Sequence, residues 1–273
     1  MSGDRKFGCE SMSNEGKCRE NWDNFQLDMQ NRVSWVLNSD DIRCVDFDVD
    51  FKGTENALDR SQNWEFPKEF LFDWRSFILD RSVFSPIDFK WSSIYIEHLP
   101  LNENDDFLDM GCGCGVIWIT ALWKYNLNSV VCADINICAV RNTIKNVSLH
   151  KVSKQVDVVQ SDVFSVSDSD MPIDKKFDLI FWNAPYFDWD FDENNILYRS
   201  MYDKNYDHIK RFILDWQNYL KEWGRIMLWF SSDKFPLEYA RKLINQIWYD
   251  LKIFYQEVDS LWYSQEILEV VKK

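Results

Sequence analysis

Three glycines alternate with two cysteines in the segment DMGCGCG, which follows a short apolar run. Because glycine lacks a Cβ atom, such a loop can turn tightly and let a ligand approach the backbone at Gly111, Gly113 and Gly115. The apolar sequence after the loop predicts a helix, whose first N–H groups are free to bind an anionic group. The loop therefore predicts a binding site in which the ligand contacts the main chain.

The spacing of these glycines argues against a nicotinamide dinucleotide as the ligand. A dinucleotide fold uses the pattern G-x-G-x-x-G, with an acid about twenty residues after the glycines. Here the third glycine comes one position early, and the acid, Asp109, precedes the loop. A carboxylate in that place suits a sulfonium amino-acid cofactor, because that ligand carries an ammonium group. A nicotinamide-dependent dehydrogenase is the disfavoured alternative.

Two further aspartates end the next two predicted strands. Asp134 ends SVVCAD and Asp162 ends VDVVQSD. A carboxylate at the first position can accept hydrogen bonds from both hydroxyls of a ribose, and one at the second can accept an amino group of adenine. Parallel sheets bind ligands at the carboxyl ends of their strands. Together with Asp109, these acids predict a cofactor that contains a nucleoside.

The elements that must position these residues alternate between strand and helix from about residue 92 onward. Strands are expected at 105–110, 129–134, 156–162, 177–183, 224–230, 251–258 and 265–271, and helices at 116–127, 137–149, 206–223 and 236–248. This alternation predicts an α/β fold with a mostly parallel sheet and helices on both faces.

The sequence before residue 83 lacks this regular alternation. Residues 1–20 have few large apolar side chains and predict a flexible tail. Residues 21–82 predict a small α+β cap that contributes to substrate recognition. Its expected elements are a loose helix at 21–37, a strand at 44–51 and a helix at 66–79 that begins at Pro67. Residues 83–273 are expected to form the main domain.

Composition excludes several classes of protein. The 273 residues are 46% hydrophobic, enough for a sizeable core, but contain no apolar run of about eighteen residues that would predict a transmembrane helix. The polar N-terminus predicts no secretory signal, so we expect a cytoplasmic protein. The seven cysteines lack the spacing of a zinc site, and no metal site is expected. The net charge of −14 disfavours a nucleic-acid acceptor, since binding phosphates requires a basic face.

Four segments resemble the motifs of class I S-adenosylmethionine-dependent methyltransferases. FLDMGCGCG is similar to the glycine-rich first motif, VVCADINICAV to the second, QSDVF to the third and FDLIFWNAPYF to the fourth. The resemblance covers residues 83–273. It implies a Rossmann-like fold with a seven-stranded, mostly parallel sheet whose last strand is antiparallel. It also implies S-adenosyl-L-methionine as the cofactor, with Ile135, Val163 and Asn183 added to the binding residues.

The fourth segment, with Asn183, Ala184, Pro185 and Tyr186, resembles the N-P-P-Y subgroup. That subgroup includes release-factor glutamine, small-subunit ribosomal RNA guanine and adenine amino methyltransferases. The resemblance implies that the Asn183 side-chain carbonyl and the Ala184 backbone carbonyl orient an acceptor nitrogen, and that Tyr186 packs against a planar acceptor. The subgroup usually has proline where this chain has Ala184, so a fixed φ is lost while the carbonyl remains. Without a ligand, the same four residues would simply be a turn.

Residues 188–193 bear on the nature of the acceptor, because they place acids between aromatic residues. They predict either a solvated loop or a receiver for a cationic or amine-bearing acceptor. We therefore expect N-methylation of an amine, amide or guanidine in a small molecule or peptide. The alternatives are a release-factor-like protein glutamine, ribosomal RNA, or a module that binds the cofactor without catalysis. If a base is needed, Tyr186 or an acid of this loop is expected. The histidines are expected to be structural: His98, His150 and His208.

Overall fold

The structure is a computed structural model that describes residues 56, 58–89, 91–166, 175–192, 194–231, 237–258 and 264–272. The expected tail at 1–20, helix at 21–37 and strand at 44–51 lie outside the described residues.

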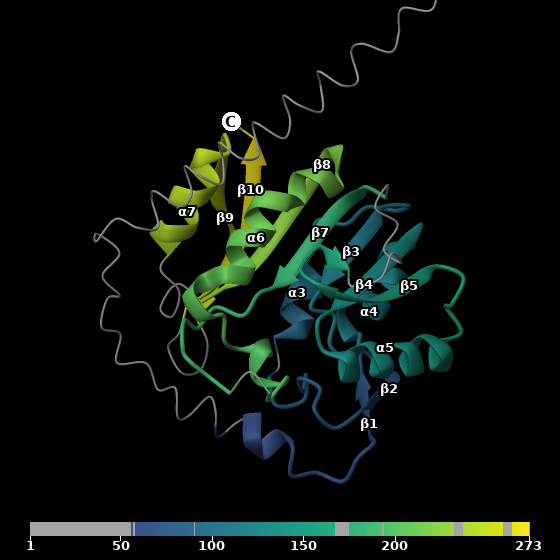
Figure 1. The fold of residues 1–273 in the computed structure, drawn as a ribbon. Coiled ribbons are helices and arrows are strands. Elements are labelled where there is room, and N and C mark those ends of the chain that lie inside the picture. The colour runs from purple at the N-terminus through teal and green to yellow at the C-terminus, as the bar shows by residue number, and fades with distance from the viewer. Residues whose placement is uncertain are drawn as a thin grey trace, which may run out of the picture. The chain divides into compact units, whose positions relative to one another are not determined.

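A single large sheet runs through the described part of the chain. Its strands are β3 (Asp106–Met110), β4 (Ser129–Asp134), β5 (Val156–Asp162), β6 (Ser165–Val166), β7 (Phe177–Asn183), β8 (Leu220–Phe230), β9 (Tyr249–Val258) and β10 (Ser264–Lys272). They lie in the order β6-β5-β4-β3-β7-β8-β10-β9 (Figure 1). Strands β5, β4, β3, β7 and β8 pair in parallel, and β10 is antiparallel to both β8 and β9. The predicted seven-stranded sheet with an antiparallel last strand is confirmed, and the two-residue β6 extends one edge.

Helices cover both faces of this sheet, as the alternation predicts. The main α-helices among the described residues are α3 (Ser92–His98), α4 (Val116–Tyr125), α5 (Ile137–His150), α6 (Asp207–Asp215) and α7 (Leu237–Gln246). Side chains of α3, α4 and α5 share one buried cluster with Phe181 of β7. The next residue, Trp182, points to the opposite face, where it packs 4.8 Å from the ring of Phe212 on α6. The short helix α3 was absent from the sequence prediction.

Residues 66–79 form a β-hairpin, so the prediction of a helix there was wrong. Strand β1 (Lys68–Phe72) pairs antiparallel with β2 (Arg75–Leu79). The two turn residues, Asp73 and Trp74, have φ values of 44° and 56°, as a two-residue hairpin turn requires. Phe77 and Leu79 are fully buried and alternate with more exposed neighbours. The alternation of buried and more exposed side chains, with a period of two, therefore determines the structure here, and the helical spacing of the apolar residues does not.

Two fully buried asparagines of α5 hold this hairpin in place. Asn146 Oδ1 accepts from the backbone N–H of Ile78 at 2.9 Å, and Asn142 Oδ1 accepts from that of Asp80 at 2.9 Å. Both side-chain amides donate to the Ile78 carbonyl, at 2.8 Å from Asn142 and 2.9 Å from Asn146. Asn146 Nδ2 also donates to the carbonyl of Cys114 in the glycine loop, at 2.7 Å. One helix therefore links the hairpin to that loop.

The helix predicted at 206–223 is shorter in the structure. It ends at Asp215, is followed by a 3₁₀ turn at Trp216–Tyr219, and gives way to β8 at Leu220. Trp216 is buried, with its ring 4.6 Å from that of Tyr249 on β9. The apolar residues after Asp215 thus pack against the sheet instead of continuing the helix.

Candidate cofactor and acceptor site

A cavity of about 760 Å³ lies at the carboxyl ends of β3, β4, β5 and β7. That volume is within the usual range for a small-molecule site. It brings together most of the predicted site residues: Gly111, Gly113, Asp134, Ile135, Asp162, Val163, Asn183, Ala184, Pro185 and Tyr186. Asp109 and Gly115 lie in the same loop region but are not among the residues that line the cavity.

The glycine loop has the backbone geometry expected of a ligand cradle. Gly111, Gly113 and Gly115 have φ values of 69°, 58° and 91°, which side chains other than glycine rarely adopt. A Cβ atom on Gly115 would lie 2.5 Å from Nε1 of Trp118, and one on Gly111 would lie 3.2 Å from Nε1 of Trp182. A Cβ on Gly113 would meet no atom within 4 Å. The loop therefore requires glycine for its own packing and leaves Gly113 open to a ligand.

Asp134 is a buried carboxylate at the end of β4. Its two oxygens accept from the backbone N–H of Gly113 at 2.9 Å and of Asn136 at 2.8 Å. Burial raises the pKa of Asp134 from 3.8 to about 6, although these hydrogen bonds act in the opposite direction. At neutral pH the group is therefore an ionised acceptor on the cavity wall, which fits a ligand with two neighbouring hydroxyl groups.

Asp109 lies deeper than the prediction of direct cofactor contact implied. Its side chain is 1% exposed, and neither carboxyl oxygen has a hydrogen-bond partner among the residues that the structure describes. Burial, with a smaller contribution from Asp134, raises its pKa well above the ordinary value. Two buried oxygens without donors leave a position for an ammonium group, which would supply both charge and hydrogen bonds. Asp109 nevertheless stands behind the cavity wall, next to the glycine loop.

Asp162 ends β5 and is engaged by two side chains of α6. Its Oδ1 accepts from Arg211 at 2.7 Å and lies 3.5 Å from Nε2 of His208. His208 also lines the cavity, although the sequence predicted a structural role for it. Val163, which follows, has a φ of 55°, an unusual backbone conformation for a β-branched residue. Strain of this kind often accompanies a functional site.

The other two histidines lie away from the cavity lining. The ring of His98 lies 3.6 Å from that of Tyr255, and the ring of His150 lies 4.9 Å from that of Phe77. His150 Nε2 is also 3.0 Å from the carbonyl of Ser76. These contacts are consistent with packing roles.

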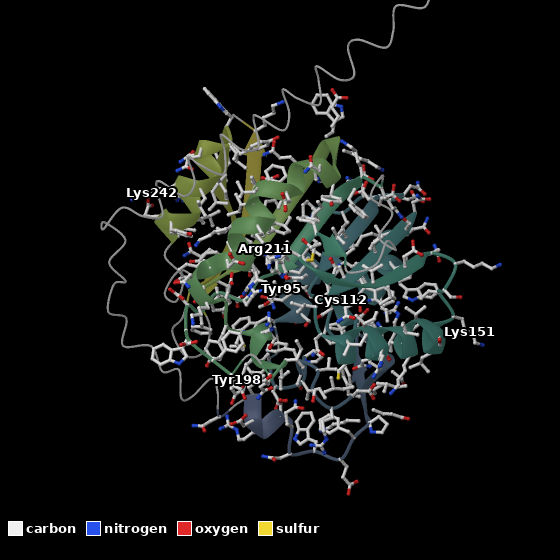
Figure 2. The ribbon with its side chains drawn as sticks, viewed as in Figure 1. Tyr95, Cys112, Lys151, Tyr198, Arg211 and Lys242 are labelled. Carbon is white, nitrogen blue, oxygen red and sulfur yellow. The ribbon has the colours of Figure 1, made fainter. Side chains whose placement is uncertain are left out.

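Asn183 is the last residue of β7 and stands beside several aromatic rings. β7 pairs Asn183 with Trp229 of β8, and Trp229 packs 4.3 Å from the ring of Tyr95 on α3. Tyr186 is half-buried, with its ring 4.9 Å from that of Phe187. All of these residues line the cavity. The Asn183 end of the cavity is thus a largely aromatic chamber, and α3 supplies a wall that sequence reasoning missed. Figure 2 labels Tyr95 together with Cys112 of the glycine loop and Arg211 of α6.

The acids of the 188–192 segment do not line the cavity. Asp188 accepts from the backbone N–H of Asn205 at 2.6 Å, and Asp190 pairs with Lys204 at 3.0 Å. Asp192 accepts from the backbone and side chain of Asn194, at 3.0 and 2.8 Å. Glu193 lies outside the described residues. These acids stabilise their own loop, so the structure brings neither a cation receiver nor the expected base from this segment to Asn183.

Charged side chains at the acceptor end come from elsewhere in the chain. Arg60, Asp88 and Arg199 line the cavity and lie within two residues of Leu58, Phe89 and Tyr198, which pack in one cluster with Tyr186 and Phe187. No helix among the described residues is both long enough and apolar enough to cross a membrane. The described residues also contain no group of three or more side chains arranged to hold a metal ion.

Comparisons with known proteins show which family this chain matches. The model of the methyltransferase small domain family matches residues 75–246. A "Putative protein N5-glutamine methyltransferase" of Methanocaldococcus jannaschii is 32% identical over 145 residues, which cover 52% of this chain and 69% of that protein. A "Ribosomal RNA small subunit methyltransferase C" of Hahella chejuensis is 27% identical over 159 residues, which cover 57% of this chain and 43% of that protein. A solved methyltransferase structure from Pyrococcus furiosus has a TM-score of 0.51 and 13% identity, over 81% of this chain and all of that one.

Proposed function

The chain belongs to the methyltransferase small domain family, within the class I S-adenosylmethionine-dependent methyltransferases, and from that premise we propose that it methylates a neutral amide nitrogen of a polypeptide. Two observations support this choice of acceptor. Asn183 and Ala184 both line the cavity, as the resemblance implies. The relative from Methanocaldococcus jannaschii, whose name gives glutamine as the acceptor, matches over two thirds of its own length.

The observation that carries the proposal is the placement of the loop acids. Asp188, Asp190 and Asp192 bind partners within the chain, so no carboxylate of this segment reaches Asn183. A cationic amine or guanidine would lack the charge partners that the sequence suggested. Apart from Asp134 and Asp162, which are assigned to the cofactor, the cavity lining has one carboxylate, Asp88, against the two guanidinium groups of Arg60 and Arg199. A neutral, planar amide suits an aromatic chamber and requires only hydrogen-bond acceptors for its N–H groups. The amide option among the sequence predictions is therefore favoured over the amine and guanidine options.

The residues of the chain would act mainly by positioning. When bound, S-adenosylmethionine supplies a methyl group on a sulfonium centre. Gly111 and Gly113 would hold its main part against the backbone, Asp134 its ribose and Asp162 its adenine. The carbonyls of Asn183 and Ala184 would accept the N–H bonds of the acceptor, which directs the nitrogen lone pair at the methyl group. Once the acceptor nitrogen carries the methyl group, it would release one proton to solvent.

A base amino group of ribosomal RNA is the second candidate acceptor. Arg60 and Arg199 line the acceptor end of the cavity, where a guanidinium group suits a phosphate. The relative from Hahella chejuensis is named for ribosomal RNA. The expectation that nucleic acid is an unlikely acceptor rested on the net charge and is not supported by these relatives. The expected small-molecule acceptor has no support among them either.

Methyl transfer to defined acceptors tests the proposal. The purified chain is incubated with methyl-labelled S-adenosylmethionine and either a peptide with a central glutamine or a short unpaired RNA. We expect label in the peptide. Label in the RNA alone would replace the proposed acceptor with the second candidate, and label in neither would reject both probes as acceptors.

The same assay tests Asn183. Asn183→Ala should lower methyl transfer by about 10²- to 10³-fold, the usual effect of losing one positioned hydrogen-bond partner. Its affinity for S-adenosylhomocysteine, measured by calorimetry, should stay close to that of the unmodified protein. Asn194→Ala is the matched control, because Asn194 lies in the following loop. Among the described residues, its backbone and side-chain N–H groups donate hydrogen bonds only to Asp192. Unchanged turnover in Asn183→Ala would reject the proposed cradle.

A further inference from the structure

A buried aspartate holds the ring of His208 at the start of α6. The Asp203 side chain is fully buried, and its Oδ1 accepts from the backbone N–H of His208 at 3.0 Å and lies 2.7 Å from Nδ1 of the ring. Its Oδ2 accepts from the backbone N–H of Ile209 at 3.0 Å. An ionised carboxylate accepts only, so Nδ1 carries a proton in this contact. The other ring nitrogen, Nε2, remains for a second partner.

That second partner is Asp162 on the cavity wall. Nε2 of His208 lies 3.5 Å from Asp162 Oδ1, the oxygen that also accepts from Arg211 at 2.7 Å. An unprotonated Nε2 would place its lone pair opposite a carboxylate oxygen, whereas a protonated Nε2 attracts that oxygen. Within the part of the chain that the structure describes, no hydrogen bond is made to Asp162 Oδ2. The imidazole thus lies between two carboxylates, with one oxygen of Asp162 held and the other open to the cavity.

We propose that His208 is a positioning residue for the adenine of the cofactor. It holds Oδ1 of Asp162, together with Arg211, so that Oδ2 accepts the exocyclic amino group. This inference rests on the proposed assignment of Asp162 to adenine. The backbone N–H of Asp203 also donates to the carbonyl of Phe187 at 2.9 Å, so the support of the histidine is joined to the chain that follows Tyr186.

Comparing two ligands isolates the contribution of the adenine amino group. S-adenosylhomocysteine and S-inosylhomocysteine share the ribose and the amino acid, but a carbonyl oxygen replaces the adenine amino group in the second. The contribution of Asp134 therefore cancels in the ratio of their dissociation constants. Calorimetry with the two ligands under the same conditions should show a preference for the adenine ligand of about tenfold, the size expected of a hydrogen bond to a charged group.

Two variants of His208 distinguish positioning from a purely structural role. His208→Asn can keep the N–H group that faces Asp203 but lacks Nε2, so the preference should be lost while the protein stays folded. His208→Gln can place an N–H group near the Nε2 position, so the preference should persist in that variant. An equal loss of affinity for both ligands in His208→Asn, or a preference that is unchanged in that variant, would overturn the proposal.

The same ratio separates this proposal from the assignment on which it rests. Asp162→Ala should abolish the preference for the adenine ligand. If that variant keeps the preference, the adenine assignment fails, whatever the His208 variants do. If Asp162→Ala loses the preference while His208→Asn keeps it, only the role of His208 fails. Should His208→Asn not fold, His208→Gln decides, and loss of the preference in that folded variant would overturn the proposal.

Discussion

Replacing Asp134 with asparagine should remove a pH-dependent part of the stability of the unliganded protein. Burial raises the pKa of Asp134 from 3.8 to about 6, so the folded protein holds this proton more tightly than the unfolded chain does. The resulting stabilisation is complete below about pH 4 and is lost as the pH rises through about 6. At 1.36 kcal/mol for each pH unit, the loss is about 3 kcal/mol. Roughly 1.5 kcal/mol of it falls between about pH 5 and pH 8.

Urea unfolding at a series of pH values measures this effect. The quantity to follow is the free energy of unfolding of the unmodified protein minus that of Asp134→Asn, in which other titrating groups largely cancel. It should fall by about 1.5 kcal/mol from pH 5 to pH 8, since only the unmodified protein has a proton to lose. The exposed Asp157, on the neighbouring strand, provides the control Asp157→Asn. A difference that stays constant with pH would refute the burial argument for Asp134.

Two further substitutions test the support of the glycine loop. Asn146→Ala leaves the N–H of Ile78 and the carbonyl of Cys114 without their partner and removes one of the two donors to the Ile78 carbonyl, so we expect a loss of about 3 kcal/mol in urea unfolding. The exposed Asn128→Ala should cost much less. Gly115→Ala places a Cβ 2.5 Å from Trp118 Nε1 at a φ of 91°, so it should destabilise by more than about 1 kcal/mol and weaken binding of S-adenosylhomocysteine. Gly113→Ala, where a Cβ meets nothing within 4 Å, should destabilise less; equal effects would count against the steric argument.

Local patterns of the sequence were sufficient to predict the central sheet. The segments that end in Asp109, Asp134, Asp162 and Asn183 are short, apolar and regularly spaced, so their type and order follow from burial between two layers of helices. The structure brings the last three to one cavity, because parallel strands end at the same edge. Asp109 lies on β3, the strand that leads into the glycine loop, but the burial of its side chain depends on how that loop packs over it. Spacing along the chain does not contain that information.

The errors arose where tertiary contacts decide the conformation. The hairpin turn uses Asp73 and Trp74 at positive φ, without the glycine or asparagine that usually marks such a turn. The acids from Asp188 to Asp192 find partners within their own loop, a result that composition does not predict. His208 gains its environment from Asp162 on a distant strand, and a lone histidine in a helix gives no sign of that contact.

The links from α5 to the hairpin have a consequence for how this region opens and closes. An isolated two-stranded hairpin is at best marginally stable in water, so the order of β1 and β2 depends on contacts with the rest of the chain. Those contacts are the hydrogen bonds of Asn142 and Asn146 and the buried side chains of Phe77 and Leu79. Asn146 also holds Cys114, and for that reason the hairpin, α5 and the glycine loop should exchange their amide hydrogens as one cooperative unit. A protein shortened to begin at residue 83 would retain the glycine loop and the hydrogen bond from Asn146 to Cys114, but it would lose the hydrogen bonds of both amides to Ile78 and Asp80. Residues that precede the cofactor motif in the sequence are therefore part of what keeps that motif folded.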